Sequence, residues 1–228
     1  MNNNIVTILQ PSFVPYLGFF SLASKCNIWI HLDNVKYTKR DWRNRNYLAG
    51  KNGKFQITIP VLSKNTKIIK DVMIDYSTQW SKKIIKSIYL NYNKCFFFQE
   101  YFSNIESIFN KKHLFLIDVN LEFFDFFCKI LKIQPQIFFA SETKVPDCGK
   151  SEYLMELCLK YKATQFNEGM KGKNFLNKEI FYSKNIKVNF FNYQITKYNQ
   201  SNTSNFIPYL SIIDAVMNLG GEGAKELL

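Results

Sequence analysis

Hydrophobic and polar positions follow two different periods along the chain. Short apolar runs, each ended by a polar or turn residue, recur near both ends, and runs of this length are typical of buried strands. Residues with helical spacing separate most of these runs, and strands that alternate with helices favour a parallel sheet. The pattern therefore predicts an α/β fold with a three-layer, Rossmann-like and mostly parallel sheet. The expected strands are residues 5–9, 28–32, 57–61, 137–140, 164–167 and 187–191.

The middle of the chain, about residues 77–132, has a different pattern. Large aromatic and aliphatic residues recur there every three or four positions in three successive stretches. Such a stripe is the core-facing side of an amphipathic helix, so we expect a helical insert of three helices. Residues 34–54 lack a clean period and are expected to form a long loop. Further helices are expected at about 15–25, 150–161, 174–182 and 211–219.

Length and composition agree with a single domain that spans residues 1–228 and includes this insert. The hydrophobic content is 46%, which is typical of a globular chain. No apolar run reaches the roughly 18 to 20 residues needed to cross a bilayer, and the first residues lack the pattern of a signal peptide. The five cysteines are scattered and form no metal-binding spacing. We therefore expect a cytoplasmic protein with reduced thiols, without a metal site or a cofactor.

The arginines are concentrated in one short segment. Arg40, Arg43 and Arg45 lie within six positions, and every other one of the 30 Lys and Arg residues is a lysine. Arg grips phosphate or carboxylate through two hydrogen bonds, which Lys cannot do. The segment therefore predicts an anion site, and a salt-bridged structural loop is the alternative. The net charge of +12 permits polyanionic partners, although most lysines are dispersed.

Polar residues follow the expected strands at their carboxyl ends. Ligands of an open parallel sheet bind beyond these ends, so Gln10, Asp33 and Glu168 are expected to lie near one site. Asp33 is the candidate general base, because it ends a strand directly before the arginine segment. His31 is a core residue or, oriented by Asp33, a second catalytic group. Glu168 and Asp214 are the next carboxylates to consider.

A second candidate anion-binding segment follows Glu168. It contains Lys171, between Gly169 and Gly172, and then Lys173, and it leads from a strand into a helix. Helix starts bind anions through free backbone amides, but the spacing is not that of a P-loop.

Several motifs resemble the WbqC-like protein family. They are residues 10–18, 32–37, 39–46, 57–61, 198–200 and 206–214, and the resemblance extends over about residues 5–220. This chain departs from the family in having His31 where an apolar residue is usual. Members are associated with gene clusters for bacterial O-antigen and surface polysaccharide. The resemblance therefore implies work on a nucleotide-linked sugar, in particular an amino sugar.

The expected function is transfer of an acyl or aminoacyl group, for example glycyl, to the amine of a nucleotide-linked amino sugar. The arginines would hold the diphosphate, Asp33 would deprotonate the amine, and Asn44 and Asn46 would orient sugar or acyl groups. The expected donor is an aminoacyl-tRNA or another activated acyl compound. Besides Asp33 and His31 as catalytic residues, the expected substrate-binding residues are Gln10, Tyr37, Lys39, Arg40, Trp42, Arg43, Asn44, Arg45, Asn46, Glu168, Lys171 and Lys173.

Two alternatives remain open on the sequence. A nucleotidyltransferase or ligase of the same pathway would fit the layout of strands, but residues 10–18 lack the phosphate-binding His motif of such enzymes. A non-catalytic protein that binds RNA or a nucleotide-linked sugar would use Trp42, Tyr37 and the arginines to stack on bases. The sequence leaves the oligomeric state open.

Overall fold

The computed structural model describes residues 4–62, 67–146 and 148–228. The chain separates into two compact units, each built from discontinuous segments. The first unit consists of Met1–Gln10, Ser21–Asn34 and Gln134–Gln194, and the second of Pro11–Phe20, Val35–Ile133 and Ile195–Leu228. The chain passes between the units within helix α1 (Leu17–Ser24). That the two units make up one domain stays a prediction.

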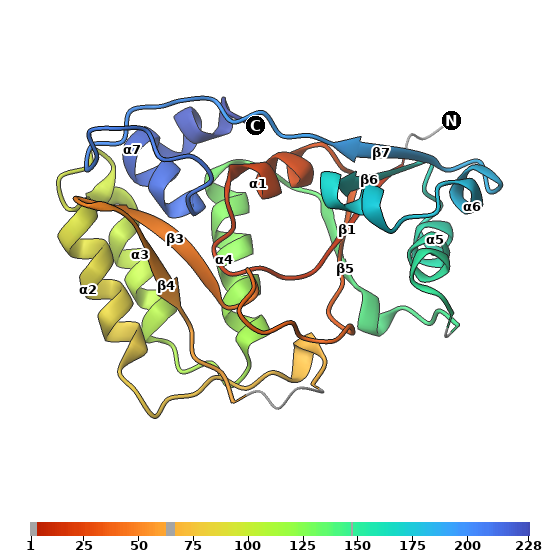
Figure 1. Ribbon diagram of the computed structural model, residues 1–228, viewed down its shortest axis with the longest axis horizontal. Coiled ribbons are helices and arrows are strands. Elements are labelled where there is room, and N and C mark those ends of the chain that lie inside the picture. The colour runs from red at the N-terminus through yellow and green to blue at the C-terminus, as the bar shows by residue number, and fades with distance from the viewer. Residues whose placement is uncertain (1–3, 63–66, 147) are drawn as a thin grey trace. The chain divides into compact units, whose positions relative to one another are not determined.

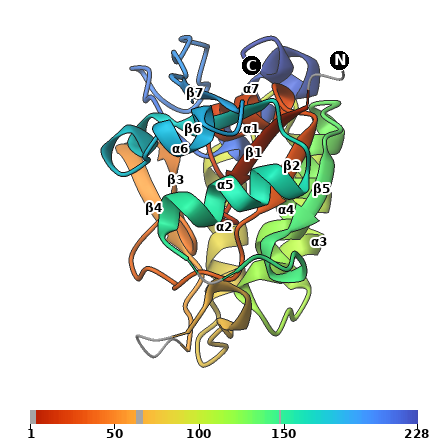
Figure 2. The same cartoon turned by 90° about the vertical axis from the view of Figure 1, so that its right-hand side faces the viewer.

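The first unit contains a five-stranded sheet in which every pair of neighbouring strands is parallel. Helices flank this sheet. In Figure 2, helix α5 crosses in front of the strands. This confirms the prediction of an α/β fold with a Rossmann-like parallel sheet. Its strands are β1 (Ile5–Leu9), β2 (Ile28–His31), β5 (Gln136–Phe139), β6 (Gln165–Gly169) and β7 (Lys187–Phe191).

The order of the strands gives this sheet a switch point. The order is β5-β2-β1-β6-β7, so the connections run outward in opposite directions from β1 and β6. Open α/β sheets bind ligands beyond the carboxyl ends of the two strands at such a point. The register places Leu9 of β1 beside His31 of β2, and Thr7 beside Asn167 of β6. The residues that follow these strands therefore lie along one edge.

The shorter helical elements of this unit follow its strands. Helix α5 (Lys150–Lys160) agrees with the prediction for residues 150–161. The predicted helix at 174–182 is shorter, because α6 covers only Glu179–Tyr182 and a separate 3-10 turn, η3 (Met170–Asn174), precedes it. A further 3-10 turn, η2 (Ala140–Glu142), follows β5.

The second unit contains a hairpin that corrects two predictions. Strands β3 (Arg45–Gly50) and β4 (Gly53–Thr58) form a separate antiparallel sheet (Figure 1), so residues 57–61 are not a strand of the parallel sheet. Residues 34–54 are likewise not all loop. Phe55 and Ile57 alternate with polar residues, and this alternation is typical of an antiparallel strand with one buried face. In β3 the buried Asn46 hides the same alternation from a hydrophobicity pattern.

The predicted three-helix insert is confirmed in the second unit. Phe13 packs edge to face on Phe109 and on Phe123, with ring centroids 6.1 Å apart in both pairs, and the rings of Phe109 and Phe123 are tilted against each other at 4.9 Å. The last helix begins after Ser211, whose hydroxyl accepts a hydrogen bond from the Ile213 amide at 3.3 Å. It is kinked at Gly220, which has a φ of 70°, so its first part ends near the predicted residue 219 and a second part continues to Lys225. The helices are α2 (Trp80–Tyr92), α3 (Phe98–Asn110), α4 (Leu116–Ile130), α7 (Ile212–Lys225) and the 3-10 turn η1 (Ile69–Asp71).

Candidate functional site

The carboxyl edge of the parallel sheet gathers several of the predicted site residues. Gln10 follows β1, Asp33 follows β2 and Glu168 is the second-last residue of β6. All three belong to the first unit, and the register of the strands aligns them along the same edge. They differ in how much of their hydrogen-bonding capacity the fold itself uses.

Asp33 is tied to the neighbouring strand connection. Its Oδ1 accepts a hydrogen bond from the Ser141 amide at 2.8 Å, and its Oδ2 accepts one from the Ser141 hydroxyl at 2.6 Å. The side chain is buried, so both carboxylate oxygens are occupied by the turn that follows β5. These bonds give Asp33 a structural task, while its role as a base stays a prediction.

His31 is enclosed in the sheet. Its Nδ1 accepts a hydrogen bond from Trp29 Nε1 at 3.2 Å, and its ring stacks on Phe139. Burial lowers the pKa of His31 to about 3, because the low-dielectric surroundings disfavour the charged imidazolium. The imidazole is therefore neutral at physiological pH and is not charged by Asp33.

Glu168 has the properties of a general base. Burial raises the pKa of its carboxyl to about 7, against the opposing effects of the Gly169 amide and of Lys150. Its Oε1 accepts the Gly169 amide hydrogen at 2.8 Å, and Oε2 forms no hydrogen bond with any residue that the structure describes. A base with a pKa near the working pH and an available oxygen transfers protons efficiently.

The backbone of η3 approaches the Glu168 side chain closely. A Cβ atom at Gly172 would lie 2.2 Å from Glu168 Cγ and 3.1 Å from the ring of Phe190. Only glycine leaves this space to the glutamate, so Gly172 is part of the support of Glu168.

Several lysines belong to the segments that pack near Glu168, and the charge of Lys150 acts on its carboxyl. The Nζ of Lys150 lies 3.2 Å from the centre of the Phe175 ring, and Lys173 and Lys178 lie within 5.9 Å of the Phe190 ring. Lys171 is exposed in the same segment. These cations could hold a phosphate group beside Glu168, as predicted for Lys171 and Lys173, although the binding itself stays a prediction.

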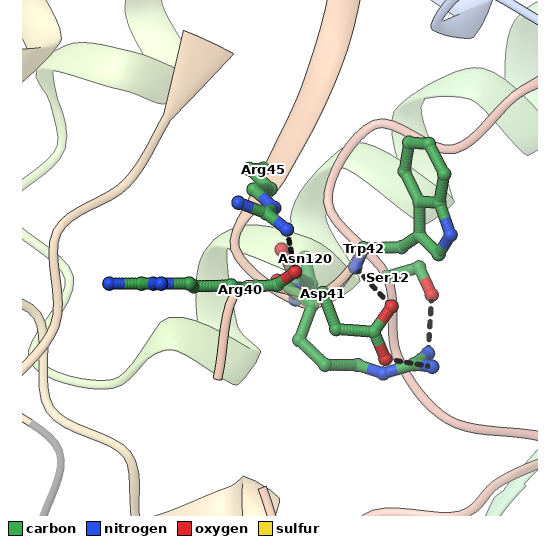
Figure 3. A network of polar contacts seen from close by, with 7 residues as sticks. Ser12, Arg40, Asp41, Trp42, Arg45 and Asn120 are labelled. Carbon is green, nitrogen blue, oxygen red and sulfur yellow. Dashed lines mark hydrogen bonds and ion pairs between the residues drawn. The ribbon is translucent and has the colours of Figure 1, made fainter. Parts of the chain in front are cut away.

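The arginine segment lies in the second unit, so its predicted convergence with Asp33 stays a prediction. Arg43 is bound to the fold: its guanidinium donates to the Ser12 hydroxyl at 2.8 Å and to Asp41 at 3.3 Å. Burial lowers its pKa, and the Asp41 carboxylate opposes that shift. Arg45 donates to the Arg40 carbonyl, whereas Figure 3 shows the Arg40 side chain extending away from Asp41 and Ser12. The three guanidinium groups therefore do not meet at one point.

Asn44 and Asn46 support neighbouring segments. Asn46 Nδ2 donates to the carbonyls of Phe13 and Val14 at 3.1 and 2.9 Å, and its Oδ1 accepts the Tyr47 amide hydrogen. Asn44 Nδ2 donates to the Ile59 carbonyl at 2.8 Å. Both side chains are buried, so these bonds describe a structural task and ligand binding by either residue stays a prediction.

The remaining predicted residues of this segment differ in exposure. Tyr37 is buried, and its pKa is raised to about 12 by burial and by the Asp41 charge. Lys39 is exposed, and Trp42 is 42% exposed. Trp42 therefore has more accessible ring surface for stacking than Tyr37, and ligand binding by either residue stays a prediction.

Asp214 is the centre of a buried hydrogen-bond network whose partners are distant in sequence, so the sequence has no local signal for it. Both oxygens of Asp214 accept hydrogen bonds, Oδ1 from Tyr92 at 2.8 Å and Oδ2 from Tyr198 at 2.7 Å and Gln200 at 2.9 Å. Burial raises the pKa of Asp214, and the three donors oppose that shift. The network gives a physical role to Tyr198, Gln200 and Asp214 in the motifs 198–200 and 206–214, while catalysis by Asp214 stays a prediction.

The described part of the chain offers no metal centre and no membrane span. It holds no group of three or more His, Cys, Asp or Glu residues placed to bind a metal ion. None of its helices is both long and apolar enough to cross a bilayer.

Comparisons with known proteins identify the family. The model of the WbqC-like protein family matches residues 10–226. The uncharacterized protein Rv1507c of Mycobacterium tuberculosis is 30% identical over 225 residues, which cover 97% of this chain and 96% of that protein. No solved structure gives a significant match. The chain therefore belongs to the WbqC-like protein family.

Proposed function

We propose that this protein is a cytoplasmic transferase that moves an acyl or aminoacyl group onto the amine of a nucleotide-linked amino sugar, with Glu168 as the general base. The observation that supports this most is the position of Glu168. It lies at the switch point of a parallel sheet, where such folds bind ligands, and keeps one oxygen free of hydrogen bonds to described residues.

The chemistry requires a base of this kind. A sugar amine is protonated at neutral pH and cannot attack an acyl carbonyl until it loses that proton. Glu168 would take the proton, the amine nitrogen would form a bond to the carbonyl carbon, and the bond from that carbon to its leaving group would break. The protonated Glu168 then returns a proton to the leaving group. Removal of a positioned base typically slows such a step by about 10²- to 10⁴-fold.

The surrounding residues suit the other parts of the substrate. Lys150, Lys171 and Lys173 provide positive charge for the diphosphate near Glu168. Asp33 would hold the edge of the sheet in shape through Ser141. The association of the family with O-antigen and surface-polysaccharide genes suggests that the acylated sugar is a precursor for such polymers.

Mass spectrometry tests the proposal directly. The purified protein is incubated with UDP- and dTDP-linked amino sugars together with acyl-coenzyme A or aminoacyl-tRNA, and the sugar nucleotide is examined for the added acyl mass. Glu168→Gln should lose at least about 100-fold in rate while still binding the sugar nucleotide in calorimetry. Glu179→Gln, which changes an exposed glutamate of α6 in the same unit, is the matched control and should keep full activity.

Two outcomes would contradict the proposal. Unchanged turnover in Glu168→Gln would remove the base role from this residue. Release of pyrophosphate from a sugar phosphate and a nucleoside triphosphate, without any acylation, would show the nucleotidyltransferase alternative instead.

A further inference from the structure

The outward face of the β3–β4 hairpin is polar, basic and aromatic. Cross-strand partners share a face, and the pairs Arg45–Thr58 and Tyr47–Gln56 lie on the accessible side of the hairpin. The opposite side is buried, with Ile57 beside Asn46. The hairpin therefore has one face committed to the core of the second unit and one that is available to a partner.

Trp42 lies at one end of this face on a fixed backbone. Its carbonyl accepts a hydrogen bond from the Phe13 amide at 2.9 Å, and its amide donates to Asp41 at 2.8 Å. Its ring is 42% exposed and contacts Tyr47 edge to face at 6.1 Å. The other two tryptophans, Trp29 and Trp80, are 0% and 5% exposed. A rigid backbone that presents a large apolar ring to solvent is suited to stacking.

Positive charge surrounds the two rings. Residues 34–60 contain seven Lys and Arg residues and one acidic residue, Asp41, which already forms an ion pair with Arg43. Lys54 Nζ lies 4.9 Å over the Tyr47 ring. Arg40 has a left-handed backbone, with φ of 56°, and its exposed side chain extends away from this ion pair (Figure 3). Non-glycine residues in that conformation are costly and cluster at functional sites.

We propose that single-stranded RNA binds to this surface, with an unpaired base stacked on Trp42. The RNA face, as we call it, consists of Arg40, Trp42, Arg45, Tyr47, Lys54, Gln56 and Thr58. Proteins bind single strands by combining aromatic stacking with a basic surface for the phosphates. The neutral groups of Gln56 and Thr58, which hydrogen-bond to each other at 2.8 Å, can instead bond to ribose 2′-hydroxyls.

This inference goes beyond acyl transfer and does not depend on it. It assigns the accessible arginines to RNA phosphates, in place of the diphosphate of a sugar nucleotide. Charge and aromatic groups together distinguish this partner: an acidic peptide needs no stacking ring, and a membrane surface needs more apolar side chains than one Trp and one Tyr.

Tryptophan fluorescence provides the test on the full chain. Titration with an eight-nucleotide single-stranded RNA of mixed sequence at 50 mM salt should quench the emission, since Trp42 is the exposed tryptophan. Trp42→Ala should abolish the quenching and weaken binding, measured by anisotropy of labelled RNA, by about tenfold or more. Phe96→Ala, which removes an aromatic ring that is 86% exposed in the same unit, should leave the affinity unchanged.

The salt dependence gives a second readout. Arg40→Gln and Lys54→Gln should each lower the slope of log affinity against log salt by about 0.7, because each removes one phosphate contact to a single strand. Lys82→Gln and Lys83→Gln change exposed lysines of α2 and should leave the slope as it is.

Other outcomes would overturn the proposal. Unchanged RNA affinity in Trp42→Ala would exclude stacking on this ring. DNA of the same sequence that binds as tightly as the RNA would exclude the choice of RNA, and binding to vesicles of anionic lipid without binding to RNA would exclude nucleic acid altogether. Quenching by UDP alone at the same concentrations would indicate a mononucleotide site.

Discussion

Asp33 and Glu168 lie at the same edge of the parallel sheet, but they differ in how many of their carboxylate oxygens accept hydrogen bonds from the fold. Asp33 accepts hydrogen bonds at both oxygens from Ser141, whereas Glu168 accepts one at Oε1 from the following amide. Sequence position favours Asp33 as the general base, because it follows a strand directly before the arginine segment. The hydrogen bonds and the burial favour Glu168 as the base, and neither property can be read from residue order alone.

The ionisation of Glu168 should make activity depend on pH. Burial raises its pKa to about 7, so the base form is scarce at pH 6 and dominant at pH 8. The acylation rate of the wild-type protein should therefore rise between these values and level off above them. Measured kcat/KM across pH 5.5–9 should show this rise, and a flat profile would contradict the base role.

The same ionisation should affect stability in the opposite direction. A raised folded-state pKa means that the stabilising contribution is complete below about pH 4.5 and is lost as pH rises through about 7. The charged form costs up to roughly 3 kcal/mol, because each tenfold change in the ionisation equilibrium corresponds to about 1.4 kcal/mol. Glu168→Gln should therefore be more stable than wild type at pH 8 in urea unfolding, with a smaller difference at pH 5.

Asp33→Asn distinguishes support from catalysis. Loss of a charged acceptor should lower the free energy of unfolding by about 1 to 3 kcal/mol, since Ser141 loses the charged partner of its two hydrogen bonds. Turnover of the folded variant should remain near that of wild type. A well-folded Asp33→Asn protein without turnover would return the base role to Asp33.

At the scale of elements, the Asp214 network ties three parts of the second unit together. The Tyr92 hydroxyl of α2 donates to Asp214 of α7 and accepts the Ala49 amide hydrogen of β3 at 2.8 Å. One phenol thus satisfies a buried backbone donor and a buried carboxylate. This position fixes the hairpin that carries the RNA face.

Removal of that hydroxyl should be costly. Tyr92→Phe leaves the Ala49 amide and one Asp214 oxygen without this partner, at about 1 to 3 kcal/mol for each buried group. Tyr89→Phe on the same helix is the control. Tyr89 is exposed, so removal of its hydroxyl should change the free energy of unfolding by less than about 0.5 kcal/mol. Equal stability of the two variants in urea unfolding would show that the network contributes little.

The turn before α1 contains a residue with a strained backbone, Val14. Val14 is fully buried with a φ of 36°, a conformation that β-branched residues rarely adopt. The Asn46 amide and the Ser211 hydroxyl both donate to the Val14 carbonyl, at 2.9 and 2.7 Å. Long-range hydrogen bonds therefore hold the backbone in a strained form.

This strain predicts an unusual order of stability. Val14→Gly and Val14→Ala lose most of the same buried side chain, but only glycine adopts positive φ without cost. The Gly variant should therefore be the more stable of the two by about 1 kcal/mol in thermal unfolding. A more stable Ala variant would mean that Val14 is not strained.

At the scale of the whole molecule, the predicted site residues fall into two sets. Gln10, His31, Asp33 and Glu168 belong to the first unit, and the segment from Tyr37 to Asn46 belongs to the second. Periodicity could predict the three helices from their apolar stripes, and it could predict most of the parallel strands from short apolar runs such as IVTIL in β1 and IWIH in β2. It could not predict the β3–β4 hairpin, since a buried Asn46 interrupts the apolar pattern and its long-range hydrogen bonds have no local signature.

The two sets should also act separately. The RNA face contains no residue of the first unit, so Glu168→Gln should bind single-stranded RNA with the affinity of the wild type within experimental error. The fluorescence titration described above measures this affinity. A large loss of RNA binding in Glu168→Gln would show that the two proposed sites are coupled.

The order of strands also has a kinetic consequence. Ile5 of the central strand β1 pairs with Gln165 of β6, 160 positions later in the chain. Closing a flexible loop of that length costs roughly 4 to 5 kcal/mol before the pairing contributes anything. Residues 35–133, which lie between these strands, form most of the second unit. If these residues fold first, the loop that must close between β1 and β6 becomes effectively shorter. Variants that destabilise α2, α3 or α4 should therefore slow the formation of the parallel sheet, although these helices contribute no strand to it.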